Sequence, residues 1–275
     1  MKSTVRTLLA LILLAFTSAV LAHTPINLYE SKLGIIGLSN DGKEYALIAI
    51  TGGQPDGAAT AGDCVITAKL TESDNKLTGL LTPFKSSFFS HEKNPLESKS
   101  ITLERKDNAI ILKDVDTLEI CGLGATFVDI YYPSRPETPK YRENYVELLN
   151  LAHEIAKNRY KSKNTLGAIE TMKPYAENLP LEWLNKTSEG EGLSEFINNY
   201  AFFLQKTGQP EAAITTLKEL VKVKPDRTVA WLNLADAYWD AEQYSNARNC
   251  YERYKKMMKA SNREASIPKL VNERI

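Results

Sequence analysis

Hydrophobic positions change their spacing about halfway along the chain. Residues 33–39 and 44–50 are short apolar runs joined by Asn-Asp-Gly-Lys, which is a strong hairpin signal. Residues 64–70 alternate Cys, Ile, Ala and Leu with Val, Thr and Lys, the period of two expected for a strand with one buried face. Similar runs follow at 76–82, 100–105, 109–115 and 126–132. This pattern predicts an N-terminal all-β sandwich or barrel over residues 23–132.

The second half of the chain has a helical pattern. From residue 141 onward apolar positions recur with a period near 3.6 and without strand-like alternation. Between the two patterns, residues 132–140 contain three prolines. We take residues 133–140 as a stiff proline-rich linker. The expected organisation is therefore two domains, with an all-α domain over residues 141–275.

The chain begins with the pattern of a secretory signal peptide. Lys2 and Arg6 precede the apolar run 8–16, and Val20 and Ala22 satisfy the small-residue rule for cleavage. The apolar run is too short to span a bilayer permanently. We expect cleavage after Ala22 and a periplasmic or secreted protein. The alternative is an uncleaved N-terminal anchor.

The charge balance gives little reason to expect a polyanionic partner. The full chain has 34 basic and 34 acidic residues. Loss of Lys2 and Arg6 with the signal peptide leaves 32 basic and 34 acidic residues, a net charge of −2. We therefore expect no binding to nucleic acid, and no stable membrane insertion after signal cleavage.

The three cysteines are unevenly placed. Cys64 and Cys121 both lie in the β region of a chain that we expect to be exported, so they are a plausible disulfide. Closing that loop would stabilise the fold by roughly 4 kcal/mol. The alternative is two buried free thiols. Cys250 is left alone and is expected to pack on a helix.

Small and large residues recur at fixed positions in the helical half. In the last copy of the pattern, Ala235 and Ala247 are the small residues, and the large or apolar ones are Trp231, Leu234, Tyr238 and Tyr251. Ala201 and Ala213 stand 34 residues before the two alanines. A weaker copy contains Ala156 and Ala168, with 11 extra residues in the stretch 181–193. Over residues 141–259 the pattern resembles the tetratricopeptide repeat.

The resemblance implies paired antiparallel helices that stack on one another, with alanines at the close contacts. It also implies a binding groove lined by the first helix of each pair. The positions of this sequence that match the groove positions are His153, Lys157, Tyr160, Asn198, Asn199, Phe202, Gln205, Asn233, Asp236 and Trp239. The alternative is an ordinary solvated face, and Trp239 could instead pack against residues 263–275 as part of a cap on the last repeat.

A specialised form of this groove is not predicted. Some members of the family hold the terminal carboxylate of a peptide with a clamp of Lys, Asn and Arg. Asn199 fits one clamp position, but Val229 and Asn233 stand where the clamp needs cations. The resemblance therefore points to a protein or peptide partner without specifying a carboxylate.

Catalytic motifs for nucleophilic, zinc or nucleotide chemistry are not found in the sequence. We expect no enzyme activity, cofactor or metal. The expected function is that of an exported protein-binding module in the cell envelope. It would act as a scaffold or as an inhibitor, including an immunity protein against an envelope-acting toxin. The alternative is an enzyme, or a carbohydrate- or lipid-binding protein, with its site in the β domain.

Overall fold

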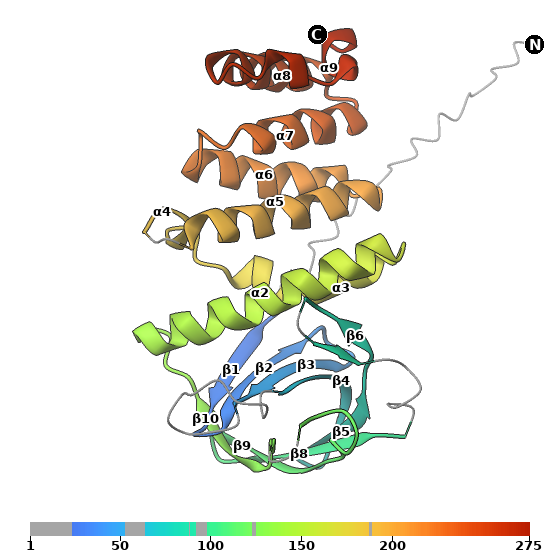
Figure 1. The fold of residues 1–275 in the computed structure, drawn as a ribbon, viewed down its shortest axis with the longest axis vertical. Helices are drawn as coiled ribbons and strands as arrows, with labels where there is room; N and C mark the ends of the chain where they lie inside the picture. The colour runs from blue at the N-terminus through green and yellow to red at the C-terminus, as the bar shows by residue number, and fades with distance from the viewer. Residues whose placement is uncertain (1–23, 53–63, 88, 92–97, 123–124, 187–188) are drawn as a thin grey trace, which may run out of the picture.

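The computed structural model describes residues 24–52, 64–87, 89–91, 98–122, 125–186 and 189–275. The expected signal peptide and its cleavage site lie outside the described residues. Figure 1 shows the strands gathered at one end of an elongated molecule, with layers of helices above them. The C-terminus lies at the end farthest from the strands.

Within the described residues, eight antiparallel strands close into a barrel in the order β1-β10-β9-β8-β5-β4-β3-β2. Their bounds are β1 (Ile26–Glu30), β2 (Gly34–Asn40), β3 (Tyr45–Thr51), β4 (Cys64–Ser73), β5 (Lys76–Leu81), β8 (Ser100–Lys106), β9 (Ala109–Val115) and β10 (Asp129–Pro133). Two short strands, β6 (Phe84–Lys85) and β7 (Ser90–His91), pair separately. The prediction of a sandwich or barrel is thus confirmed as a barrel.

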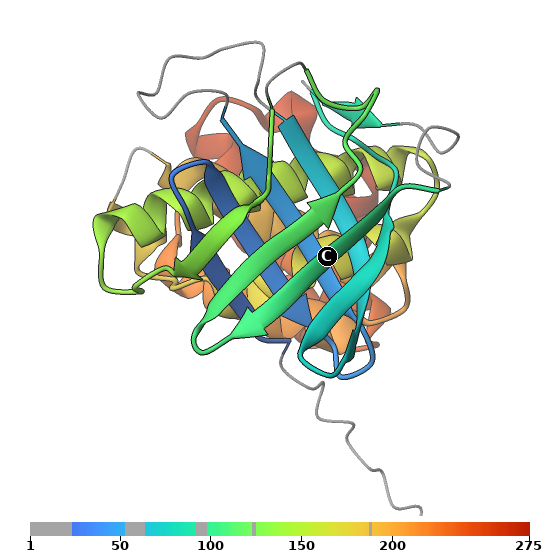
Figure 2. The ribbon, with the colours of Figure 1, turned by 90° about the horizontal axis from the view of Figure 1, so that it is seen from below.

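The alternation along β4 places one set of side chains inside the barrel. Ile66 and Leu70 join the interior hydrophobic cluster. On the opposite face, Val65 is 1% exposed and belongs to the cluster formed with the helices. The expectation of a single buried face was therefore wrong for the start of this strand. Val65 shares that cluster with Phe84 and with residues of the helices, which lie behind the barrel in Figure 2.

The predicted disulfide is present. It joins Cys64 at the start of β4 to Cys121 in the segment after β9, with the two Cα atoms 5.5 Å apart. The bridge thus ties one barrel strand to the connection that leads toward β10. Cys250 is a buried free thiol on a helix, as expected.

The segment between barrel and helices is shorter than the predicted linker. Pro133 ends β10, and α2 (Pro139–Lys161) already begins at Pro139. Thr138 caps α2, because its Oγ1 accepts a hydrogen bond of 3.1 Å from the backbone N–H of Tyr141. Pro139 fits the first turn of a helix because its missing N–H would have no helical partner there.

Six helices of the described residues form three antiparallel pairs. The pairs are α2 with α3 (Thr165–Asn178), α5 (Gly190–Lys206) with α6 (Pro210–Val223), and α7 (Thr228–Asp240) with α8 (Tyr244–Ala260). The extra stretch between the first two pairs contains the short helix α4 (Trp183–Lys186). After α8 the chain forms a 3₁₀ turn, η1 (Glu264–Ser266), and α9 (Lys269–Glu273). In the described residues, no helix is both long and apolar enough to cross a membrane.

Besides the cluster inside the barrel, a second hydrophobic cluster contains residues of both barrel and helices. Leu28, Ile35 and Val65 from the barrel belong to the same cluster as the buried residues of α2 and α3. At Gly37 the two parts are close, since an added Cβ would lie 2.8 Å from the hydroxyl oxygen of Tyr175. The first helix pair is therefore packed directly on the outer face of β1, β2 and β3.

Polar contacts reinforce this interface. The backbone N–H of Thr24 donates to Oε2 of Glu177 at 2.8 Å, and Nδ2 of Asn178 donates to the Thr24 carbonyl at 2.9 Å. Nδ2 of Asn144 donates to Oε2 of Glu30 at 2.7 Å. These bonds join residues more than a hundred positions apart and fix α2 and α3 against the barrel.

Candidate binding face

The predicted groove residues lie on the first helix of each pair, α2, α5 and α7, which we call the A helices. We call the ten predicted residues the A-helix face. Several of them contact one another across neighbouring A helices. The structure thus brings the predicted residues together along the stack, as the repeat pattern implies.

Polar and aromatic contacts join α2 to α5. The side-chain amide of Asn199 lies 2.9 Å from Nε2 of His153, and the rings of Tyr160 and Phe202 meet edge to face with centroids 5.6 Å apart. Aromatic pairs of this geometry are stabilising beyond their burial alone. Phe202 is only half-buried and also carries the ammonium group of Lys206 over its ring at 5.2 Å.

Two further contacts join α5 to α7. Nδ2 of Asn233 donates to Oδ1 of Asn198 at 3.1 Å, and Nε2 of Gln205 donates to Oδ2 of Asp240 at 2.7 Å. Asn198 and Gln205 are buried. These two predicted groove residues therefore serve mainly to join the repeats, and offer little surface to a partner.

His153 is buried as well. Its side chain is 7% exposed and packs edge-on against Phe196. Burial, with a smaller contribution from the charge of Lys157, lowers the pKa of His153 to about 4. The ring is therefore neutral near pH 7. Its Nε2 is positioned to accept the hydrogen bond from Asn199.

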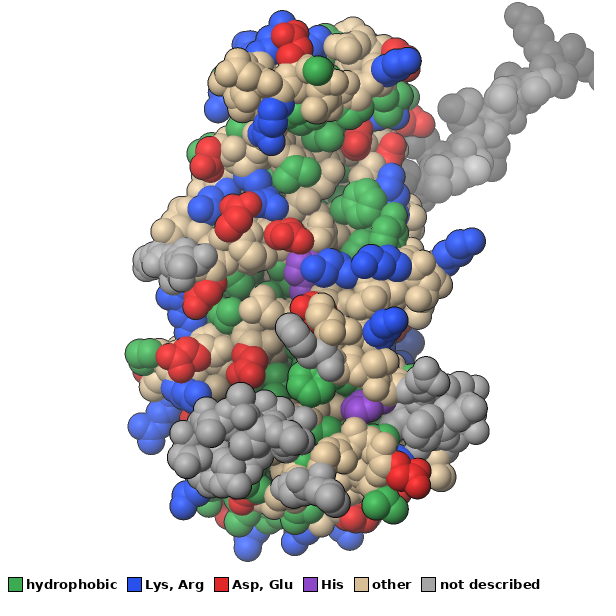
Figure 3. All heavy atoms as spheres, viewed as in Figure 1, with side chains coloured by type: hydrophobic (Ala, Val, Ile, Leu, Met, Phe, Trp, Pro, Cys, Tyr) green, Lys and Arg blue, Asp and Glu red, His purple; other side chains and the backbone are tan. Residues whose placement is uncertain are grey.

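The remaining members of the A-helix face are half-buried. They are Lys157, Tyr160, Asn199, Phe202, Asn233, Asp236 and Trp239. They combine aromatic rings with amides and charges. In Figure 3 a hydrophobic patch at the level of α5 lies above a row of Lys and Arg side chains at the level of α2 and α3. Such a mixture offers contact area together with polar groups that can orient a bound segment.

Trp239 is in contact with the end of the chain. The guanidinium of Arg274 lies over its ring at 4.6 Å, and the rings of Tyr244 and Tyr251 lie 4.8 and 6.5 Å away. This is the packing against residues 263–275 that the sequence left as the alternative. Arg274 was not among the predicted site residues because it follows the last repeat and matches none of its positions.

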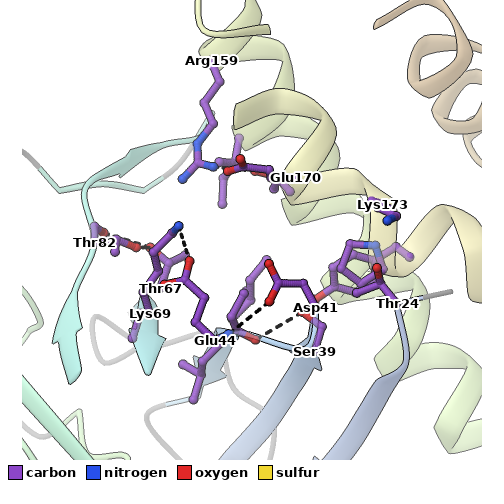
Figure 4. A pocket seen from close by; sticks show the side chains of 18 residues that line it. Thr24, Ser39, Asp41, Glu44, Thr67, Lys69, Thr82, Arg159, Glu170 and Lys173 are labelled. Carbon is purple, nitrogen blue, oxygen red and sulfur yellow. Dashed lines mark hydrogen bonds and ion pairs between the residues drawn. The ribbon is translucent and has the colours of Figure 1, made fainter. Parts of the chain in front are cut away.

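A cleft separates part of the barrel from α2 and α3 (Figure 4). Its volume is about 260 Å³. Lys69 and Glu44 form an ion pair on the barrel side, and Arg159 and Glu170 project from the helices. Nη1 of Arg159 donates to the Gly167 carbonyl at 3.0 Å and to Oγ1 of Thr171 at 2.7 Å.

The cleft has a balanced charge. Its acidic lining residues are Asp41, Glu44 and Glu170, and its basic ones are Lys69, Arg159 and Lys173. Burial lowers the pKa of the Arg159 guanidinium, although it stays protonated near neutral pH. The lining also includes the hydroxyls of Thr67 and Thr82, which lie 2.7 Å apart. This composition suits a small polar molecule better than a strongly charged one.

The described part of the chain contains no group of three or more His, Cys, Asp and Glu side chains placed to hold a metal ion. One of the two histidines in that part is His91. Its Nε2 lies at hydrogen-bond distance, 2.9 Å, from the Val65 carbonyl oxygen, and its ring packs against Phe84.

A family model described as tetratricopeptide repeat matches residues 200–262. This range covers the end of α5 and all of α6, α7 and α8, where the alanines recur at 34 residues. Over these residues the helical half is similar to the tetratricopeptide repeat. We call its three helix pairs the first, second and third repeats, and the three together the TPR region. No curated protein sequence matches the chain.

Solved TPR structures are similar to this chain at low identity. The first TPR domain of Spaghetti (RPAP3) bound to an HSP90 peptide is 14% identical to this chain. The match covers 46% of this chain and 92% of that domain's chain, with a TM-score of 0.35. The Sgt2 TPR domain from Aspergillus fumigatus is 19% identical, with 44% and 68% covered and a TM-score of 0.33. The assignment of the repeats rests on the family match and on the helix pattern.

Proposed function

We propose that this protein is exported and that the A-helix face of its TPR region binds a protein or peptide partner in the cell envelope. The observation that carries the proposal is the set of half-buried aromatic and polar side chains brought together from α2, α5 and α7. TPR regions are protein-interaction modules, since each repeat adds one helix to an extended surface.

Export is supported by two features of the chain. The N-terminal sequence has the charge, apolar run and small residues of a signal peptide. The bridge between Cys64 and Cys121 is of the kind that persists in oxidising compartments. N-terminal sequencing of protein extracted from the envelope should therefore begin at His23. A cytoplasmic protein that retains Met1 would contradict export.

The A-helix face can be tested by site-specific cross-linking in the full chain. A photoreactive residue at Lys157, half-buried on α2, should form a covalent link to the partner in intact cells. The matched control is Lys218, which is exposed on α6 and outside the face. Equal yields at the two positions, or no cross-linked protein at either, would argue against this function.

The role of the complex is proposed in two forms. As a scaffold, the protein would bind its partner and leave the partner's activity intact. As an inhibitor, including an immunity protein against an envelope-acting toxin, it would abolish that activity at one equivalent. Once the partner identified by cross-linking has been purified on its own, its activity is measured as the full chain is added. This titration separates the two forms.

The cleft supports a second candidate, a small polar ligand such as a carbohydrate held between barrel and helices. The threonine hydroxyls and the balanced charges favour neutral, hydroxyl-rich molecules. Addition of mono- and disaccharides should then shift the NMR signals of residues around Thr67 and Lys69. Shifts confined to other surfaces would exclude the cleft.

A further inference from the structure

The last turn of the chain continues the contacts between A helices. Each pair of neighbouring A helices is joined by side chains of the A-helix face, as described for α2 with α5 and α5 with α7. In the row of A helices, α7 is followed by the C-terminal segment, residues 264–275, which comes after α8 and contains η1 and α9. Arg274 from this segment contacts Asp236 and Trp239 of α7, in the place where a following repeat would supply its own residues.

Three groups of the third repeat surround the guanidinium of Arg274. Its Nη1 donates to Oδ1 of Asp236 at 3.0 Å and to the hydroxyl of Tyr251 at 2.6 Å. The ring of Trp239 covers one face of the guanidinium at 4.6 Å. The Tyr251 hydroxyl in turn donates to Asp236. We call Asp236, Trp239 and Tyr251 the arginine site.

The chemistry of the arginine site favours a guanidinium over other groups. A carboxylate and a phenolic oxygen accept from its planar fork while an aromatic ring stacks on its face. An ammonium ion lacks the plane for stacking and the fixed donor directions. The ion pair is largely removed from water, since the side chains of Arg274 and Asp236 are 18% and 29% exposed.

The segment that supplies Arg274 is only lightly held. Val271 is the one buried residue of α9, and Ile267 is half-buried. The helix has five residues, against thirteen in α7, and most side chains from 261 to 275 are exposed. Releasing this segment therefore uncovers far less apolar surface than separating two repeats would.

We propose that the arginine site is part of the partner-binding surface, that Arg274 fills it in the free protein, and that an arginine of the partner replaces Arg274 in the complex. This inference rests on the proposed function of the TPR region. The partner then presents an exposed, arginine-bearing segment. The C-terminal segment acts as an internal competitor that weakens binding of segments without a suitable arginine.

The test uses the full chain and the probe peptide acetyl-Gly-Arg-Gly-amide, with a citrulline peptide of the same shape as the neutral control. Arg274→Ala should bind the arginine peptide about tenfold more tightly than the unaltered chain, because the competitor is gone. Adding Asp236→Asn to Arg274→Ala should remove this gain. Titration followed by NMR locates the peptide at Trp239.

Two further variants keep the test decisive. Arg263→Ala removes the same charge from the exposed loop before η1 and should leave peptide affinity unchanged. Arg274→Gln retains much of the side chain and replaces Arg274→Ala if that variant melts too early. Equal binding of the arginine and citrulline peptides, or equal binding to Arg274→Ala and the unaltered chain, would overturn the inference.

The inference and the proposed function fail in different ways. One outcome is that the partner cross-links at Lys157 in the Asp236→Asn and Arg274→Ala chains with the same yield as in the unaltered chain. In that case the TPR region binds its partner without the arginine site, and the inference is wrong. If the peptide binds as expected but no partner cross-links, the arginine site stands as a guanidinium site and the proposed function is wrong.

Discussion

A buried histidine lies at the junction of the first two repeats. The ring of His153 accepts from Asn199 and packs on Phe196, and burial lowers its pKa to about 4 from an ordinary 6.5. In the unfolded chain the same side chain takes up its proton near pH 6.5. Between these two pH values only the unfolded state binds that proton, so protonation favours unfolding.

This difference predicts a loss of stability on acidification. As the pH falls from 6.5 to 4, His153 should reduce the free energy of unfolding by up to about 3 kcal/mol, and below pH 4 its contribution should level off. His153→Gln should show a smaller fall over that range. Urea denaturation at several pH values measures the free energy of unfolding of both chains. If it changes equally with pH in the two chains, His153 is excluded as the source of the pH dependence.

Trp239 has a structural role that the sequence could only offer as an alternative. Its ring contacts Tyr244, Tyr251 and Arg274. Trp239→Ala should lower the free energy of unfolding by about 2 kcal/mol, because it leaves a gap in the last repeat. It should also weaken partner binding by the folded fraction. Lost stability with unchanged affinity would remove Trp239 from the binding face.

At the scale of elements, the repeat period was readable because close helix contacts restrict residue size. Ala201 and Ala235 are fully buried, as are Ala213 and Ala247, and only a small side chain fits at such contacts. β1 gave no comparable signal. It has five residues without clear alternation, and it pairs with the adjacent β2 on one side and with the distant β10 on the other. Its pairing with β10 closes the barrel and depends on a partner that the local pattern does not contain.

The alanine contacts make a second prediction. Ala235→Leu should overpack the junction within the third repeat and lower the free energy of unfolding by about 1–3 kcal/mol. The control is Ala260→Leu, at the exposed end of α8, which should change it by less than about 0.5 kcal/mol. Chemical denaturation of the two variants tests the difference. Equal effects would mean that Ala235 is not a close contact.

At the scale of the molecule, the sequence indicated two domains joined by a linker, and the structure adds a hydrophobic cluster that contains residues of both halves. The alternation of β4 and the proline content of 132–140 each indicate local structure only. Neither contains the information that Val65 joins a cluster with residues of the helices, because that cluster depends on the three-dimensional path between distant segments. The groove residues were found because the repeat fixes their positions, and Arg274 was missed because it lies beyond the repeat.

The cluster shared by barrel and helices predicts that a single substitution can open the interface between them. Gly37→Leu should force β2 away from Tyr175 and Leu148, which a Cβ at this position would already approach at 2.8 and 3.1 Å. Digestion with a nonspecific protease should then cut residues 134–138 faster than in the unaltered chain. Gly192→Leu, at a position with open space around it, serves as the control. An unchanged rate of cleavage in the Gly37→Leu chain would mean that close packing at this position is not needed to hold the barrel against the helices.

The contacts at the two ends of the TPR region also govern how the protein can vary in length. The barrel packs on the first repeat through α2 and α3, and Arg274 contacts the third repeat through Asp236 and Trp239. A repeat inserted between existing ones, for example between α6 and α7, would leave both sets of contacts in place. Such an insertion must come in whole units, and the 34-residue spacing of Ala201 and Ala235 sets their size. Insertions of other sizes would place the alanines out of register with their neighbours.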